Sequence, residues 1–109
     1  MQGRLLIKHA VGGRTFVDSA KGGTPFEAKE LPDGAGWAFE VRLAAGEAAD
    51  EIVKWRNELN VFVFEEDRQP VVKHWFYADG GSVAYDEPAG VLRLRAASKI
   101  EYVPDEYTW

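Results

Sequence analysis

Two stretches of the chain alternate apolar and polar side chains with the two-residue period of a strand that is covered on one face. They are Trp37–Leu43 and Val91–Ala96. The apolar faces consist of Trp37, Phe39, Val41 and Leu43 in the first stretch and of Leu92, Leu94 and Ala96 in the second. A slip of one residue would turn such a set outward, so the register should be firmly set. The pattern predicts antiparallel strands with one face on a core and the other in water.

A different apolar pattern predicts a central β-hairpin over Val61–Ala78. Its first arm, Val61–Phe64, is an unbroken run of β-branched and aromatic residues, and its second arm, Val71–Ala78, follows a charged loop that ends at Pro70. A run of four apolar residues can also be a buried helix segment, but four residues make barely one helical turn. We therefore expect the first arm to be a central strand covered on both faces.

The spacing of apolar residues changes to that of a helix between Ala44 and Leu59. The apolar positions at this spacing are Ala45, Ala48, Ile52, Trp55 and Leu59. Acidic residues stand early in the stretch and basic residues later, as the helix dipole favours. The sequence predicts one helix over residues 44–59, and the alternative is a long loop with a single helical turn around Ala48–Val53.

Glycine- and proline-containing turn signals separate several further short strands. The expected strands are Arg4–His9, Arg14–Asp18, Pro25–Leu31, Ser82–Tyr85, Ile100–Val103 and Tyr107–Trp109, with a flexible loop at residues 19–24 and a tight turn at Asp79–Gly81. Seven to nine short strands and one helix in 109 residues fit a single β-rich domain, residues 1–109. We predict a mainly β fold, an antiparallel β-sandwich or small barrel with one short helix.

The formal net charge is −5, and it is distributed unevenly. Residues 1–23 carry +3, because Arg4, Lys8, Arg14 and Lys21 outnumber Asp18, and the remaining residues carry −8 by difference. An acidic protein is poorly suited to general binding of phosphate backbones, so we expect no nucleic-acid partner. The basic N-terminal arm, residues 1–23 with Arg4, Lys8 and Arg14, could pair with an acidic neighbour or a second copy; the alternative is that these are ordinary solvated side chains.

The sequence lacks the motifs of the common catalytic and metal sites. It has no cysteine, no Gly-x-Ser-x-Gly segment, no calcium-binding Asp-x-Asp-x-Asp-Gly loop and no glycine-rich phosphate cradle. The only histidines are His9 and His74, and His74 alternates with Val72 and Phe76 as a core residue would. We therefore expect no enzymatic activity, no metal and no cofactor. No apolar run is long enough to span a bilayer or to serve as a signal peptide, so we expect cytoplasmic synthesis.

Aromatic residues on the second hairpin arm are the strongest functional signal. Alternation places Lys73, Trp75 and Tyr77 together, opposite the face that carries His74. If the His74 face is core, the two aromatic side chains are displayed outward, where they suit a protein contact or stacking on a sugar ring. The alternative is that both faces are covered, one by the second sheet and the other by the helix with Trp55.

Turn and alternation signals in the second half of the chain carry a resemblance to a known family. They are the segment Val83–Asp86, the glycine-led strand Gly90–Arg95, and the turn at Pro104 that leads to Tyr107 and Trp109. This pattern resembles the N-terminal β-sandwich domain of phage baseplate upper proteins and related tail modules. The resemblance implies a structural, non-catalytic role as an assembly subunit of a virion tail, baseplate or similar particle.

These observations together predict a non-enzymatic assembly or protein-interaction module, with protein partners, a homo-oligomer or neighbouring subunits, and the virion as a destination. The predicted interaction surface consists of Lys73, Trp75, Tyr77, Tyr102 and Trp109. One alternative is a carbohydrate-binding sandwich that stacks a glycan on Trp75, Tyr77 or Tyr102. The other is a small ligand-binding or enzymatic barrel with His74 in a polar pocket.

Overall fold

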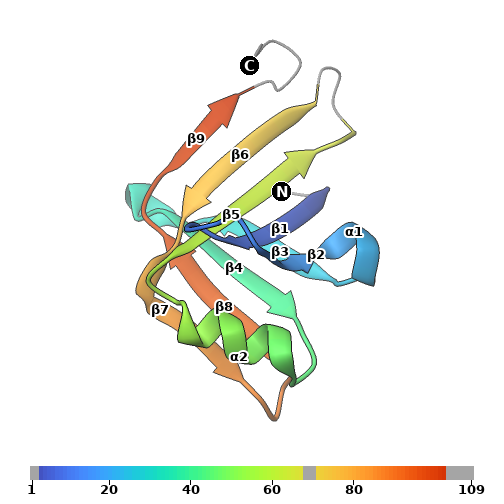
Figure 1. The fold of residues 1–109 in the computed structure, drawn as a ribbon. Helices are drawn as coiled ribbons and strands as arrows, with labels where there is room; N and C mark the ends of the chain where they lie inside the picture. The colour runs from blue at the N-terminus through green and yellow to red at the C-terminus, as the bar shows by residue number, and fades with distance from the viewer. Residues whose placement is uncertain (1–2, 68–70, 103–109) are drawn as a thin grey trace.

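The computed structural model describes residues 3–67 and 71–102, which form two antiparallel sheets (Figure 1). Sheet A has the strand order β2-β1-β5-β6-β9, and sheet B has the order β3-β4-β8-β7. The strands of sheet A are β1 (Arg4–His9), β2 (Thr15–Asp18), β5 (Leu59–Glu65), β6 (Val72–Tyr77) and β9 (Lys99–Tyr102). The strands of sheet B are β3 (Phe26–Glu30), β4 (Trp37–Arg42), β7 (Asp79–Asp86) and β8 (Val91–Ala96). The predicted fold class, a small antiparallel β-sandwich with one short helix, is confirmed.

The two alternating stretches form neighbouring strands at the centre of sheet B. In the β4–β8 ladder, Phe39 pairs with Leu94 and Val41 pairs with Leu92. All four side chains are buried, because each is the inward member of its alternation. Figure 1 shows that the strands of the two sheets cross rather than run side by side.

The predicted hairpin is also present, as β5 paired with β6 in the middle of sheet A. The expectation that its first arm is covered on both faces is wrong. Val61 and Val63 are fully buried between the sheets, whereas Phe62 and Phe64 on the other face are only half-buried. That face is shielded by neighbouring side chains rather than by a second layer of secondary structure.

Helix α2 (Glu47–Lys54) is shorter than the predicted helix over residues 44–59. It is longer than the single helical turn of the alternative. Leu59 fits the helical spacing, but it is the first residue of β5, where it fits the two-residue alternation equally well. The buried residues of α2 are Ala49 and Ile52. The helix contacts β2 of sheet A and β7 of sheet B, so it closes the side of the sandwich between them (Figure 1).

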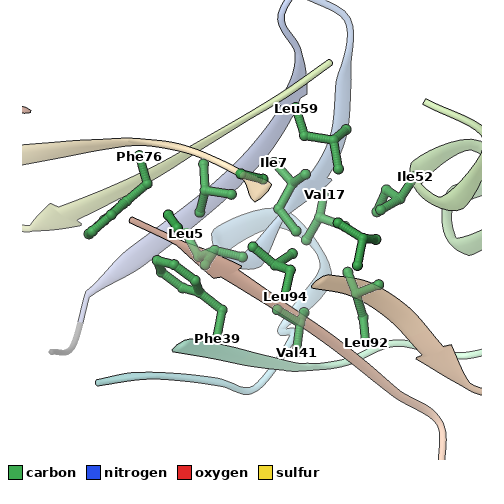
Figure 2. Packing of buried hydrophobic residues seen from close by; sticks show 14 of the residues in the cluster. Leu5, Ile7, Val17, Phe39, Val41, Ile52, Leu59, Phe76, Leu92 and Leu94 are labelled. Carbon is green, nitrogen blue, oxygen red and sulfur yellow. The ribbon is translucent and has the colours of Figure 1, made fainter. Parts of the chain in front are cut away.

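The core is one apolar cluster built from both sheets and α2. Figure 2 shows side chains of the two sheets pointing toward one another, with Ile52 reaching in from the helix. The largest fully buried side chains include Phe39, Phe76, Leu5, Ile7, Ile52, Leu59, Leu92 and Leu94. Phe39 meets Phe76 edge to face, with ring centroids 4.8 Å apart, so this pair joins sheet B to sheet A.

Several segments predicted as loops or turns have regular structure. A short helix, α1 (Ser19–Gly22), replaces the predicted flexible loop because the Asp18 carboxylate accepts a hydrogen bond from the Ala20 N–H at 3.1 Å and caps it. The predicted turn at Asp79–Gly81 is instead the start of β7, which is irregular between Asp79 and Ala84. The predicted turn after β3 is the short 3-10 helix η1 (Pro32–Gly34). The predicted strand Tyr107–Trp109 lies outside the described residues.

The predicted basic arm is part of the folded domain. Strand β1 lies between β2 and β5, and β2 is an edge strand of sheet A. Arg4 forms an ion pair with Asp18 at 2.7 Å, and Arg14 pairs with Glu47 at 3.2 Å. These contacts tie the basic residues to β2 and α2. None of the helices in the described part of the chain is long and apolar enough to cross a membrane.

A single residue connects the two sheets after the hairpin. Strand β6 ends at Tyr77 in sheet A, and β7 begins at Asp79 in sheet B. Ala78 between them is buried, and its N–H donates to the Leu59 carbonyl at 3.1 Å. The chain therefore changes sheets without a loop.

Candidate functional site

A row of apolar side chains crosses the outer face of sheet A. Strand pairing places Leu6 opposite Phe62, Phe62 opposite Trp75, and Trp75 opposite Ile100. Leu6, Phe62 and Trp75 alternate with buried residues, and Ile100 lies directly opposite Trp75, so all four lie on the outer face. We call these four residues the apolar row. The side chains of Trp75 and Ile100 are 37% and 57% exposed, and Leu6 and Phe62 are half-buried.

The aromatic members of the row hold each other in place. The rings of Phe62 and Trp75 stack with centroids 5.9 Å apart and planes 27° from parallel. The ammonium of Lys73 lies 4.4 Å from the Phe62 ring centroid and 5.3 Å from that of Phe64. The lysine stem therefore covers part of β5 while its charge stays at the surface.

Tyr77 extends the aromatic surface beside the row. Its side chain is 57% exposed, and its hydroxyl donates to the Asn57 carbonyl at 2.9 Å. A hollow of about 120 Å³ lies next to it, and the residues that line it are Trp75, Tyr77, Ser98, Lys99 and Ile100. This volume corresponds to about four water molecules, so it can take one apolar side chain.

The charged residues of this face are mostly basic. Arg4, Lys8 and Lys73 point outward from β1 and β6, as Asp18 does from β2 beside Arg4. The Arg4 guanidinium donates two hydrogen bonds to the Asp18 carboxylate, at 3.0 and 2.7 Å. This hydrogen bonding lowers the pKa of Asp18 and raises the pKa of Arg4 from their ordinary values. Asp18 is therefore a charged partner of Arg4.

The structure brings three of the five predicted surface residues together. Lys73, Trp75 and Tyr77 share the outer face of β6, and the backbone of Tyr102 pairs with Lys73, while Trp109 lies outside the described residues. The alternative in which the helix covers this face is wrong, because Trp55 instead packs on His9 with ring centroids 4.9 Å apart. The role of Lys73, Trp75 and Tyr77 in binding stays a prediction.

Sequence reasoning missed the other members of the apolar row, which are Leu6, Phe62 and Ile100. Their alternation was visible within each strand, but only the register across four strands places them beside Trp75.

A second constellation lies on the inner face of the same strands, around His74. This side chain is only 3% exposed, as the core interpretation predicted. Its Nε2 atom lies 3.3 Å from the Glu65 carboxylate, and its Nδ1 atom lies 3.1 Å from the Lys99 ammonium and 3.5 Å from the Glu101 carboxylate. Lys99 and Glu101 also pair with each other at 3.1 Å.

The contacts of His74 fix its tautomer. A lysine ammonium can only donate, so Nδ1 accepts from Lys99, and in the neutral ring the proton sits on Nε2. The contact of Nε2 with Glu65 lacks hydrogen-bond geometry, and no other described residue bonds this buried atom. The cluster fastens the edge strand β9, which carries Lys99 and Glu101, to β6.

The described polar groups that contact His74 belong to Glu65, Lys99 and Glu101, and none of them is a serine or threonine hydroxyl. Two of the serines hold structural bonds: Ser19 Oγ accepts from the Leu5 N–H at 2.8 Å, and Ser82 Oγ donates to the Asp79 carbonyl at 2.6 Å. His9 is engaged elsewhere, with Glu58 at 3.2 Å. Within residues 3–67 and 71–102, no group of three or more candidate ligands could hold a metal ion.

The outer face of sheet B has a different chemistry. A groove of about 610 Å³ runs over it, with the small side chains of Ala38 and Ala84 among those that line it. Charged side chains surround these alanines, and Arg93 lies 3.6 Å from Glu40 and 3.4 Å from Asp86. This arrangement is typical of a solvated strand face.

Comparison of the chain with models of protein families, with curated proteins and with solved structures gave no match. The resemblance to phage baseplate and tail domains therefore stays a prediction from the sequence.

Proposed function

We propose that this domain is a non-enzymatic interaction module that binds a protein partner through the apolar row and Tyr77. The observation that carries the proposal is the position of Trp75 and Ile100, which are large and apolar yet remain 37% and 57% exposed. Partly exposed aromatic residues held by neighbouring rings supply contact area with little loss of side-chain entropy on binding. An assembly subunit of a virion tail or baseplate would use such a face against its neighbours.

The protein-binding proposal has more support than the carbohydrate alternative. In the described residues Trp75 is the one exposed tryptophan, and its indole is already stacked on Phe62. A row of four apolar side chains across four strands matches an extended apolar contact better than a single sugar ring. A panel of oligosaccharides tests the alternative directly.

Trp75→Ala tests the proposal, with Arg95→Ala on the outer face of sheet B as the matched control. The wild-type protein is used to select binders from a random-peptide display library, and its self-association is measured by light scattering over a range of concentrations. We expect Trp75→Ala to weaken the selected peptides, or self-association, by about 30-fold or more, the loss of a hot-spot residue. Arg95→Ala should leave both unchanged.

Stability measured on the same variants separates a contact role from a core role. Trp75→Ala should lower the free energy of unfolding by less than about 2 kcal/mol, because it removes the stack on Phe62 but opens no cavity in the core. A cost of about 3–5 kcal/mol would make Trp75 a core residue and contradict the proposal. Failure to select any peptide, together with a wild-type protein that stays monomeric, would contradict it as well.

A further inference from the structure

Strand β9 is the sheet edge best placed to pair with a strand of a second chain. Among the four edge strands of the described sheets, β2 is contacted by helices α1 and α2, and β7 is irregular between Asp79 and Ala84. Strand β3 presents the charged Glu27 and Lys29 on its outer face. Helices, irregularities and outward charges protect a sheet edge from pairing. Strand β9 instead pairs with β6 in an unbroken register, and Ile100 on its outer face is 57% exposed.

The hydrogen-bonding pattern of sheet A shows which backbone groups of β9 face this edge. The Ala78 N–H donates to the Leu59 carbonyl at 3.1 Å, so Ala78 directs its backbone groups toward β5. Successive residues of an antiparallel strand direct these groups to opposite sides, so Trp75 directs its own toward β9 and the residue opposite, Ile100. The residues on either side of Ile100 therefore direct their N–H and C=O groups to the free edge.

The charges of these two residues, Lys99 and Glu101, favour one register between two copies of β9. With Lys99 opposite Glu101 of the second copy, Ile100 lies opposite Ile100, and neighbouring charges across the junction have opposite signs. Within one chain Lys99 and Glu101 already lie 3.1 Å apart, so the four side chains alternate in sign. Registers that place Lys99 or Glu101 opposite itself bring like charges together, which is destabilising.

We infer that this protein self-associates through β9, whose two copies pair antiparallel about Ile100 and join the two A sheets into one. The partner is a second copy of this chain, related by a two-fold axis at Ile100. The apolar row of each copy ends at Ile100, so the two rows meet end to end. The pairing leaves the outer faces of Trp75 and Tyr77 open, so this inference goes beyond the proposed function and does not depend on it.

The contact is small, so the dimer should be weak. Each copy contributes the four-residue strand Lys99–Tyr102. A stable complex buries about 1,200 Å² of surface or more, which a single pair of short strands does not reach. We therefore expect the protein to be monomeric at about micromolar concentration and to dimerise at about millimolar concentration.

Single cysteines test the register, because the chain has no cysteine of its own. Side chains directly opposite each other on antiparallel strands have Cβ atoms about 4.5–5.5 Å apart, so Ile100→Cys can form a disulfide with its own copy. Ser98→Cys is the matched control, because it is exposed on the same strand edge but lies about 14 Å from its copy in this register. In a glutathione redox buffer at about millimolar protein, we expect Ile100→Cys to give at least about tenfold more cross-linked dimer.

Charge swaps provide a second test that needs no cross-link. Lys99→Glu and Glu101→Lys each place like charges opposite each other, so each should weaken the dimer at least about fivefold in sedimentation equilibrium. The double variant restores opposite charges and should recover the dimer. Because Lys99 lies 3.1 Å from Nδ1 of His74, thermal unfolding of every variant is measured alongside.

Three outcomes would overturn the inference. They are equal cross-linking at positions 98 and 100, a wild-type protein that stays monomeric at about millimolar concentration, and a folded double charge swap that does not recover the dimer. The proposed function is judged separately, by the display selection and Trp75→Ala. A monomeric protein that still selects peptides would keep the interaction module and reject the β9 dimer. Self-association that Trp75→Ala abolishes, without excess cross-linking at position 100, would assign it to the apolar row instead.

Discussion

The inner faces of the two sheets are both apolar and buried, but the side chains on their outer faces differ in chemistry. On sheet A the outward residues include Phe62, Trp75 and Ile100, which line up across neighbouring strands. On sheet B the corresponding positions carry alanines and charges, and Arg93 pairs with Glu40 and Asp86. Both sheets satisfy the same two-residue alternation, so folding alone does not require the aromatics on sheet A. This difference supports the proposal that sheet A, rather than sheet B, carries a contact surface.

The sharpest way to break this comparison is to truncate inner and outer residues of the same strand. Phe76→Ala should cost about 3–5 kcal/mol, because it opens a cavity against Phe39, whereas Trp75→Ala should cost less than about 2 kcal/mol. Leu94→Ala and Arg95→Ala form the matching pair on sheet B, with about 2–5 kcal/mol expected for the leucine. Urea unfolding measures all four. Equal costs for Phe76 and Trp75 would mean that the outer face of sheet A is not a surface.

A second test measures how much the ion pair between Asp18 and Arg4 stabilises the fold at different pH values. The pKa of Asp18 is lowered in the folded protein by its hydrogen bond with Arg4, so this interaction stabilises the fold above the ordinary carboxyl pKa of about 3.9 and is lost as pH falls through the folded value. Asp18→Asn should therefore be less stable than the wild type near neutral pH, and the two should converge in acid. A gap that persists in acid would show that the difference does not come from the charge of Asp18.

The smallest change in the free energy of unfolding is expected for an exposed ion-pair residue on sheet B. Arg93 pairs with Glu40 and Asp86 at 3.6 and 3.4 Å, and all three side chains are well exposed. Such pairs contribute about 0–1 kcal/mol and are screened by salt. Arg93→Ala should therefore change the unfolding free energy by less than about 1 kcal/mol at low salt and by almost nothing in molar salt. A larger loss that salt does not reduce would show that this face is more than a solvated surface.

Much of the fold could be predicted because alternation is a local property of the sequence. The strands at Trp37 and Val91 and the central hairpin follow from patterns within six or seven residues. The end of α2 could not be located in the same way, since Leu59 satisfies both the helical and the strand period. Tertiary pairing with His9 in β1 decides that Leu59 belongs to β5.

The candidate site was only partly predictable, because it depends on register between strands far apart in the sequence. Trp75 and Tyr77 could be predicted from one strand. Leu6 and Ile100 join them only through pairing with partners that lie more than 20 residues away. The same applies to the buried cluster: His74 was expected in the core, but Glu65 was assigned to a solvated loop and only the fold brings it within 3.3 Å.

Ala78 leaves the chain almost no freedom to extend where it passes from sheet A to sheet B. A loop at this junction would let the two sheets move apart. Ala78 is a single buried residue whose N–H bonds to Leu59, so the sheets cannot separate here without breaking that hydrogen bond. Opening either layer therefore strains the other, and the amide of Ala78 should exchange its hydrogen only when the whole domain unfolds. The end of β6 and the start of β7 are therefore expected to move together.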